Sequence, residues 1–207
     1  MARLTLTTFL TLDGVMQAPG GPEEDRAGGF PYGGWLAPFF DPDTDRFIGE
    51  VFERAQAFLL GRRTYEIFAG FWPGITDPAD AVAARLNGLP KYVATHTLTD
   101  PRWQHTTLLG GDVPAEVARL KERLDGDGEL QIHGSGALAR TLMGHDLIDE
   151  YHLLVAPVAL GAGIRLFPEG GPPTAFELTA SHVTASGTAL LSYRPTGRPA
   201  FGDFTRA

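Results

Sequence analysis

Two glycine-containing turns carry the residues of this sequence best suited to bind an anion. The first is Gly134-Ser135-Gly136, which follows a short apolar strand predicted at 129–133 and precedes an amphipathic helix. Free backbone N–H groups and the helix dipole favour a phosphate at a helix N-terminus, and glycine lets a ligand approach the main chain closely. An ordinary strand-to-helix connection has the same pattern, so this turn alone leaves both interpretations open.

The second turn, Gly61-Arg62-Arg63-Thr64, again joins a short apolar strand, AFLLG, to a predicted helix. Two arginines in a first helical turn oppose the helix dipole unless a negative group faces them. A dianionic phosphate would remove this conflict, because arginine recognises phosphate through paired hydrogen bonds. The alternative interpretation is a solvated helix end.

Alternating strands and helices must position these turns. The pattern predicts strands at 3–12, 57–61, 91–97, 106–109, 129–133 and 150–158, with helices beginning near 43, 62, 80, 114 and 136. A hairpin follows, with strands at 175–184 and 188–194. This order predicts an α/β fold in which a mostly parallel sheet ends in an antiparallel hairpin and carries helices on both faces.

Ligands bind such sheets beyond the carboxyl ends of the strands, where three turns are predicted: Asp13-Gly14, Gly61 to Thr64 and Gly134 to Ala137. A long loop at 17–43 separates the first strand from a helix predicted to run from Asp43 or Thr44 to Ala57. It has no predicted secondary structure and contains the aromatic residues Phe30, Tyr32, Trp35, Phe39 and Phe40. Such loops are often lids. We expect this one to cover a flat ligand or a partner subunit, with a plain surface loop as the alternative.

Length, charge and composition limit the classes of function. The 207 residues suit a single domain, 1–207, and a formal net charge of −8 argues against general binding to nucleic acid or to an anionic membrane. The absence of cysteine excludes disulfides, thiolate zinc sites and a thiol nucleophile, and no metal site is predicted. The N-terminus resembles a strand more than a signal peptide, and no apolar run approaches the roughly 18 residues of a membrane helix. We therefore expect a cytoplasmic protein that acts on a small molecule.

Five motifs in order resemble those of dihydrofolate reductase and, more closely, the reductase domain of bacterial riboflavin biosynthesis with its stand-alone relatives. They are the strand and DG turn at 4–14, LLGRRTYE at 59–66, the strand ending Ala94-Thr95-His96-Thr97, IHGSGALARTLM at 132–143 and DEYHLLVAPVALGAGIRLF at 149–167. They span nearly the whole chain. The resemblance implies a dihydrofolate reductase-like mixed sheet of about eight strands and NADPH as the cofactor.

The resemblance also assigns cofactor contacts to three groups of residues. In the family's GRxT element, the arginine and the helix terminus meet the adenosine 2′-phosphate while the threonine helps to hold the pyrophosphate; the matching residues are Gly61, Arg62, Arg63 and Thr64. A strand end on the adenosine side is matched by Thr95, His96 and Thr97, although His96 could equally be a surface histidine. The glycine turn beneath the pyrophosphate is matched by Gly134, Ser135, Gly136 and Ala137.

For the reacting centre the resemblance implies two acids. Asp45 lies sixteen residues before Gly61, the spacing at which dihydrofolate reductases carry the acid that holds a pterin-like ring and assists its protonation. Asp13 resembles the acid of the SxDG element in the riboflavin-pathway reductases. Each has a structural alternative, because an acid stabilises a helix start and aspartate is a common turn residue.

The leading hypothesis is an NADPH-dependent reductase that transfers a hydride to a small pterin-like, pyrimidine-like or other heteroaromatic substrate. Family analogy adds a homodimer, whose interface we expect to include the apolar strand at 151–158. The alternative is a non-catalytic module that binds a nucleotide or another small molecule on the same fold. The chain lacks the His, Glu and paired Cys signature of the riboflavin-pathway deaminase, so it cannot catalyse both steps of that two-step enzyme.

Overall fold

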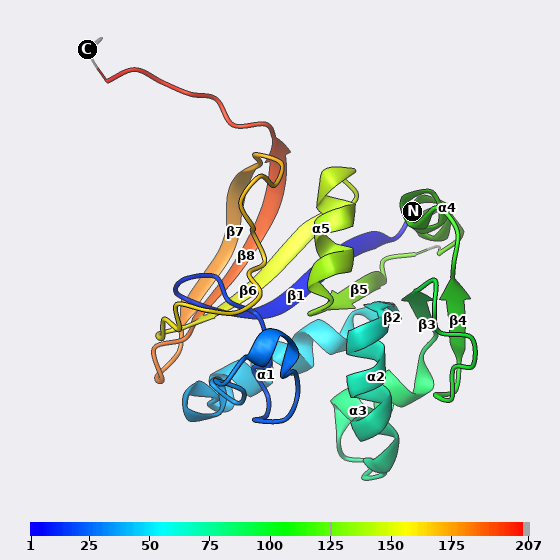
Figure 1. The fold of residues 1–207 in the computed structure, drawn as a ribbon. Helices are drawn as coiled ribbons and strands as arrows, with labels where there is room; N and C mark the ends of the chain where they lie inside the picture. The colour runs from blue at the N-terminus through cyan, green and yellow to red at the C-terminus, as the bar shows by residue number, and fades with distance from the viewer. Residues whose placement is uncertain (125, 205–207) are drawn as a thin grey trace.

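The computed structural model describes residues 1–124 and 126–204. Eight strands form one mixed sheet in the order β4-β3-β2-β5-β1-β6-β8-β7 (Figure 1). Their bounds are Arg3–Thr11 (β1), Ala55–Gly61 (β2), Lys91–Ala94 (β3), Thr106–Leu109 (β4), Glu129–His133 (β5), Glu150–Ala156 (β6), Ala175–Val183 (β7) and Ala189–Gly197 (β8). All neighbours from β4 to β6 are parallel, whereas β8 is antiparallel to both β6 and β7. The predicted fold class is confirmed.

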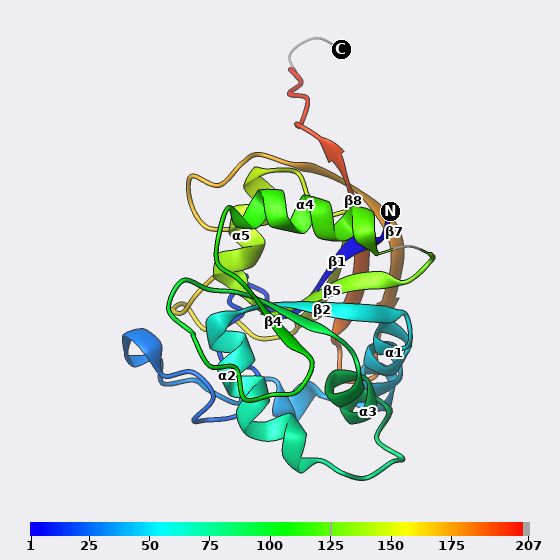
Figure 2. The same ribbon diagram turned by 90° about the vertical axis from the view of Figure 1, so that its right-hand side faces the viewer.

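Helices cover both faces of the sheet (Figure 2). The α-helices of the described residues are Pro42–Glu53 (α1), Arg62–Phe71 (α2), Ala81–Gly88 (α3), Val113–Arg123 (α4) and Gly136–Gly144 (α5). On one face, Leu120 of α4 and Leu142 of α5 join a core with Leu6 of β1. On the other face, α1, α2 and α3 pack over β2 and β3, where Phe52 and Leu86 join a second core. Burying each such side chain contributes roughly 1.5–3 kcal/mol.

Helix α1 is shorter than predicted and begins earlier. Asp41 is its N-cap, with a side chain that accepts a hydrogen bond from the Thr44 amide, and Glu53 is its last residue rather than Ala57. The chain already joins the sheet at Ala55, which pairs with Glu129 of β5. Arg54 fixes this transition, because its Nε lies 2.8 Å from the Glu129 carboxylate. Pairing in the sheet therefore overrides the apolar helical pattern that the sequence continues through Ala55.

Two strands, β3 and β6, end two or more residues before their predicted limits. Strand β3 stops at Ala94, because the Thr95 hydroxyl accepts hydrogen bonds from the amides of Thr97 and Leu98 and turns the chain. Strand β6 stops at Ala156, before Pro157. The turn predicted at 125–128 begins at Asp125, which lies outside the described residues.

The loop between β1 and α1 contains two short 3-10 helices, Ala27–Gly29 and Ala37–Phe39, where no secondary structure was predicted. Phe30 and Trp35 are buried in a small apolar cluster with Val15 and Ala156. The Trp35 indole N–H donates to the Gln17 carbonyl oxygen at 2.7 Å. These two aromatic side chains therefore anchor the loop to the sheet, whereas Tyr32 and Phe40 stay exposed.

Strand β6 lies inside the sheet, between β1 and β8, and its side chains are largely buried. The prediction that this strand contributes to a subunit interface stays a prediction, and its buried side chains leave little surface for one. The edge strand on this side of the sheet is β7, which lies beyond β8. Within the part of the chain that the structure describes, no helix has the length and apolar character needed to cross a membrane.

Candidate functional site

A cleft of 1780 Å³ lies at the carboxyl ends of the parallel strands. It brings together eleven of the twelve predicted site residues: Asp45, Gly61, Arg62, Arg63, Thr64, Thr95, His96, Gly134, Ser135, Gly136 and Ala137. Asp13, which the structure also describes, is the one that does not line it. The topology explains the convergence, because the ends of β2, β3 and β5 are neighbours at one edge of the sheet.

The two glycine turns are joined to each other by hydrogen bonds. The Gly61 amide donates to the Ser135 hydroxyl oxygen at 3.0 Å, and the Ser135 amide donates to the Thr64 hydroxyl oxygen at 3.1 Å. The Ser135 hydroxyl donates in turn to the His133 carbonyl oxygen at 3.1 Å. These contacts hold the N-termini of α2 and α5 side by side at the cleft.

The N-termini of α2 and α5 also differ from those of the other described α-helices. Asp41, Asp80 and Asp112 cap α1, α3 and α4 through their side chains. By contrast, Gly61 and Ser135 make no side-chain cap to α2 or α5. The first-turn amides of a helix have no partner within that helix. Both N-termini therefore present N–H donors to the cleft, as an anion site requires.

The turn before α5 has two successive residues in the left-handed backbone conformation. Gly134 and Ser135 both have left-handed φ values, 56° and 51°. Such a conformation costs roughly 1–2 kcal/mol for a residue with a Cβ atom, and the two hydrogen bonds of the Ser135 hydroxyl offset it. At Gly136 a Cβ atom would lie 2.7 Å from the Met16 sulfur, so a larger residue there would require the Met16 side chain to move.

Arg62 and Arg63 lie at the rim of the cleft and are both about half exposed. Arg62 pairs with Glu66 of the same helix at 3.0 Å, whereas Arg63 reaches the loop and pairs with Asp25 at 2.8 Å. Exposed pairs of this kind contribute little to stability, so the two guanidinium groups can exchange an acid for another anion. Two cations are thus available for the predicted phosphate contact. In the free protein each of them is paired with an acid of the same chain, which would compete with a phosphate for it.

The opposite wall of the cleft is one face of α1. Asp45, Ile48 and Phe52 follow each other at helical spacing and line the cleft together. Asp41, not Asp45, caps α1, but Asp45 lies in the first turn of α1, where an acid also stabilises the helix dipole. Among the described residues, no partner forms a hydrogen bond or ion pair with the Asp45 carboxylate, which is therefore free to meet a ligand.

Asp13 anchors the segment that follows β6. Its carboxylate accepts hydrogen bonds from the amides of Leu160 and Gly161 at 3.1 and 2.8 Å, and Arg165 pairs with it at 3.3 Å. The hydroxyl of Thr11, followed by these amides, lowers the pKa of Asp13 to about 2. A catalytic role for Asp13 stays a prediction, whereas its contacts favour a structural one.

Thr95 and His96 reach the cleft from the end of β3. The Thr95 side chain is buried and occupied by the turn that it stabilises, whereas His96 is exposed at the rim. His96 is thus accessible to a ligand, while a contact from Thr95 would come through its O–H, which can still donate, or through its main chain.

The floor of the cleft contains residues that sequence reasoning missed. Thr7 of β1 and His133 of β5 are paired in register, are both buried and both line the cleft. His133 stacks on Phe52 of α1 with the ring centres 4.3 Å apart. Burial, with a smaller contribution from His152, lowers the pKa of His133 to about 3, so this imidazole is neutral. Strand β5 was predicted to be apolar; its alternating Glu129, Gln131 and His133 were the signal for a polar face.

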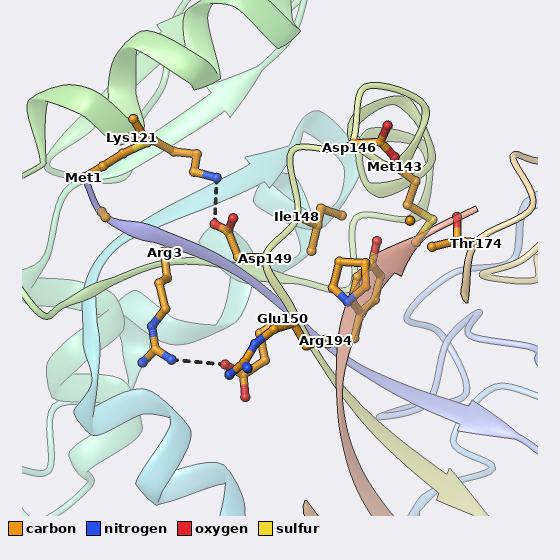
Figure 3. A pocket seen from close by; sticks show the side chains of 14 residues that line it. Met1, Arg3, Lys121, Met143, Asp146, Ile148, Asp149, Glu150, Thr174 and Arg194 are labelled. Atoms are coloured by element: carbon orange, nitrogen blue, oxygen red, sulfur yellow. Dashed lines mark hydrogen bonds and ion pairs between the residues drawn. The ribbon is translucent and has the colours of Figure 1, made fainter. Parts of the chain in front are cut away.

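A second cavity, of 620 Å³, lies at the amino ends of the parallel strands, near the start of β1 and β6. Figure 3 shows two pairs among its charged side chains, Lys121 with Asp149 and Arg3 with Glu150. The distances are 2.6 and 3.1 Å. Because these charges already have partners, the cavity is a weaker candidate site than the cleft.

Comparisons with known proteins agree with this geometry. The model of the RibD C-terminal domain matches residues 2–191. The uncharacterized protein YwjB of Bacillus subtilis (strain 168) is 30% identical over 135 residues, which are 65% of this chain and 71% of YwjB.

Two solved structures share the fold. A protein assigned to riboflavin biosynthesis from Shewanella sp. PV-4 aligns with a TM-score of 0.71 and 24% identity, over 95% of this chain and 99% of that one. Dihydrofolate reductase from Enterococcus faecalis, complexed with NADP(H), aligns with a TM-score of 0.58 and 14% identity, over 94% and 96% of the two chains. At such identities the likeness shows the fold alone. The family match covers most of the sequence, and the chain therefore belongs to the RibD C-terminal domain family.

Proposed function

We propose that this protein is an NADPH-dependent reductase acting on a small pterin-like, pyrimidine-like or other heteroaromatic substrate. The observation that carries the proposal is the pair of uncapped helix N-termini, α2 and α5, joined through Gly61, Ser135 and Thr64 at one cleft. Membership of a family named for a riboflavin-pathway domain supports a reductase-type function.

The residues present fit the cofactor. The first-turn amides of α2 and α5 would hold the pyrophosphate, and Gly136 leaves room where a side chain would collide with Met16. Arg62 and Arg63 would hold the adenosine 2′-phosphate, with His96 at the same rim. When bound, the nicotinamide supplies a hydride, which is chemistry that no amino-acid side chain provides.

The substrate would bind between α1 and the end of β1. Ile48 and Phe52 offer an apolar wall for a flat ring, and Asp45 offers a carboxylate on the same wall. We propose that Asp45 holds the polar edge of the ring and assists its protonation, since a reduced ring needs a proton as well as a hydride. Asp13 would act indirectly, by holding the segment around Gly161.

The proposal is tested by following NADPH absorbance with a panel of oxidised pterins and pyrimidines. Asp45→Asn should leave the Kd for NADPH unchanged and lower kcat by about 100-fold, a typical loss for a general acid. Glu50→Gln is the matched control, because Glu50 is exposed on the same helix and does not line the cleft. Tight NADPH binding without oxidation of any substrate would favour the non-catalytic module instead.

A further inference from the structure

A row of polar side chains crosses the middle of the sheet beneath α1. The register places His133 of β5 beside Thr7 of β1, Thr7 beside His152 of β6, and His152 beside Ser192 of β8. All four are buried, with exposed fractions of 7% or less. The side chains of Phe52 and Phe47, both from α1, cover the two histidine rings. The row meets the cleft only at the His133 and Thr7 end, since the lining includes neither His152 nor Ser192.

Hydrogen bonds fix which nitrogen of His133 carries the proton. The Gln131 side-chain amide donates both to the Val51 carbonyl oxygen at 2.6 Å and to the Glu129 carboxylate at 2.9 Å. Its oxygen is therefore the acceptor that lies 3.1 Å from His133 Nε2. Because an amide oxygen only accepts, Nε2 must be protonated. In a neutral imidazole the other nitrogen, Nδ1, then carries a lone pair.

Two polar groups lack partners where the row meets the cleft. The Thr7 hydroxyl is buried and makes no hydrogen bond, and His133 Nδ1 has no partner among the described residues. By contrast, the buried polar groups further along the row are paired. His152 Nδ1 lies 2.9 Å from the Ser192 hydroxyl, and Glu129 is paired with Arg54. Buried polar groups are nearly always satisfied, so the unpartnered Thr7 hydroxyl, beside an imidazole that lines the cleft, indicates a ligand.

From this arrangement we infer that His133 Nδ1, with the Thr7 hydroxyl beside it, binds an N–H edge of an amino-substituted heteroaromatic substrate. The inference rests on the proposed function and deepens it. Nδ1 can only accept a hydrogen bond, and the Asp45 carboxylate on the neighbouring wall also offers acceptor oxygens. A ring with amino or ring N–H groups satisfies both acceptors, whereas a ring bearing only ether or carbonyl oxygens leaves Nδ1 buried and unpaired.

The test compares 2,4-diaminopteridine with 2,4-dimethoxypteridine, in which methoxy groups replace the N–H donors, by calorimetry with and without saturating NADPH. Wild-type protein should bind the diamino probe at least about tenfold more tightly, and His133→Leu should remove about tenfold of its affinity without affecting the dimethoxy probe. His133→Asn should restore part of the loss, because its side-chain oxygen can accept. An equal loss for both probes in His133→Leu, no discrimination by the wild type, or no binding of either probe would overturn the inference.

Thr7→Val gives a second test that does not depend on the histidine variants folding. Valine keeps the shape of threonine and removes the hydroxyl, so the melting temperature should stay the same or rise if that hydroxyl has no partner in the free protein. A fall in melting temperature would show a structural partner and contradict the inference. NADPH titrations of the same samples separate the two proposals. If the wild type does not bind NADPH, the proposed function is refuted. If the wild type binds NADPH normally and the His133 variants do not change binding of the diamino probe, only this inference is refuted.

Discussion

Asp13 and Asp45 illustrate how surroundings separate two carboxylates near the same end of a sheet. Asp45 is exposed on a cleft wall without a described partner, whereas Asp13 accepts hydrogen bonds from two amides and the Thr11 hydroxyl. A group satisfied in this way holds a loop and has little capacity left for a ligand. The free carboxylate is the one suited to substrate contact.

The anchoring role of Asp13 predicts a particular pH dependence of stability. Its pKa is about 2 in the folded protein and about 3.9 in an unfolded chain, so ionised Asp13 stabilises the fold above about pH 4. This contribution is lost as the pH falls from about 4 to about 2. Asp13→Asn should therefore be less stable than the wild type at neutral pH, with a difference that shrinks in that acid range.

Urea unfolding midpoints across the acid range would measure this difference. Asp100→Asn, at an exposed position, is the control and should change little. A difference between Asp13→Asn and the wild type that stays constant down to pH 2 would contradict the anchoring role.

Residue types alone predicted the glycine turns that line the cleft, but not the polar residues at its floor. Gly61, Arg62, Arg63, Thr64 and the Gly134 turn were found because glycine, arginine and a following helix form a recognisable pattern. His133 was missed because strand β5 was interpreted as apolar. Its importance depends on the tautomer set by Gln131 and on the register with β1, which are properties of the folded sheet.

At the level of elements, the ion pair between Arg63 and Asp25 joins α2 to the loop that borders the cleft. Asp25 is largely buried, with a side chain 10% exposed. The neighbouring Glu24 carboxylate accepts hydrogen bonds from the Gly20 and Gly21 amides, and burial raises the pKa of Glu24. Acids of this loop thus occupy donors that an anionic ligand could use.

This contact predicts that Asp25 competes with the cofactor phosphate for Arg63. Asp25→Asn should tighten NADPH binding by up to about fivefold, the contribution expected of one partly exposed ion pair, and should leave NADH binding unchanged. Fluorescence titration with both nucleotides measures it, with Asp100→Asn as the control at an exposed position that does not line the cleft. Weaker NADPH binding in Asp25→Asn would instead show that the acid positions Arg63 for the phosphate.

The ends of helices and strands could be predicted from the sequence only where local residues, such as glycine or proline, determine them. Glycine and proline fixed the ends of α2 and β6 to within a residue or two. The end of α1 could not be predicted, because the apolar pattern runs through Ala55 and the helix stops where β2 pairs with β5. That the loop covers a ligand or a partner subunit stays a prediction, and its buried Phe30 and Trp35 form an anchor that depends on β1 and β6.

For the whole molecule, the order of strands leaves β7 as an exposed edge. None of its nine residues is fully buried, and Leu178 and Val183 are 50% and 66% exposed. An edge strand with apolar side chains is a template for pairing with another chain. We propose that β7, rather than the predicted β6, forms the interface of a homodimer.

Light scattering should then give a mass about twice the 22.3 kDa of one chain. Leu178→Lys should shift the mass toward the monomer, because a lysine on an edge strand opposes pairing. Glu177→Gln, at an exposed position on the same strand, is the control. A wild-type protein that is monomeric at high concentration would contradict the proposed dimer. That residues 1–207 form a single domain also stays a prediction.

The central claim is that the cleft between α2 and α5 binds NADPH through its extra phosphate. Titration of the wild type with NADPH and NADH tests it most directly, and Trp72, which lines the cleft, provides a fluorescence signal. We expect NADPH to bind at least about tenfold more tightly, and Arg63→Ala and Arg62→Ala to remove most of this preference without weakening NADH. Arg46→Ala, on the exposed side of α1, should change neither affinity. Equal affinity of the wild type for the two nucleotides would contradict the account.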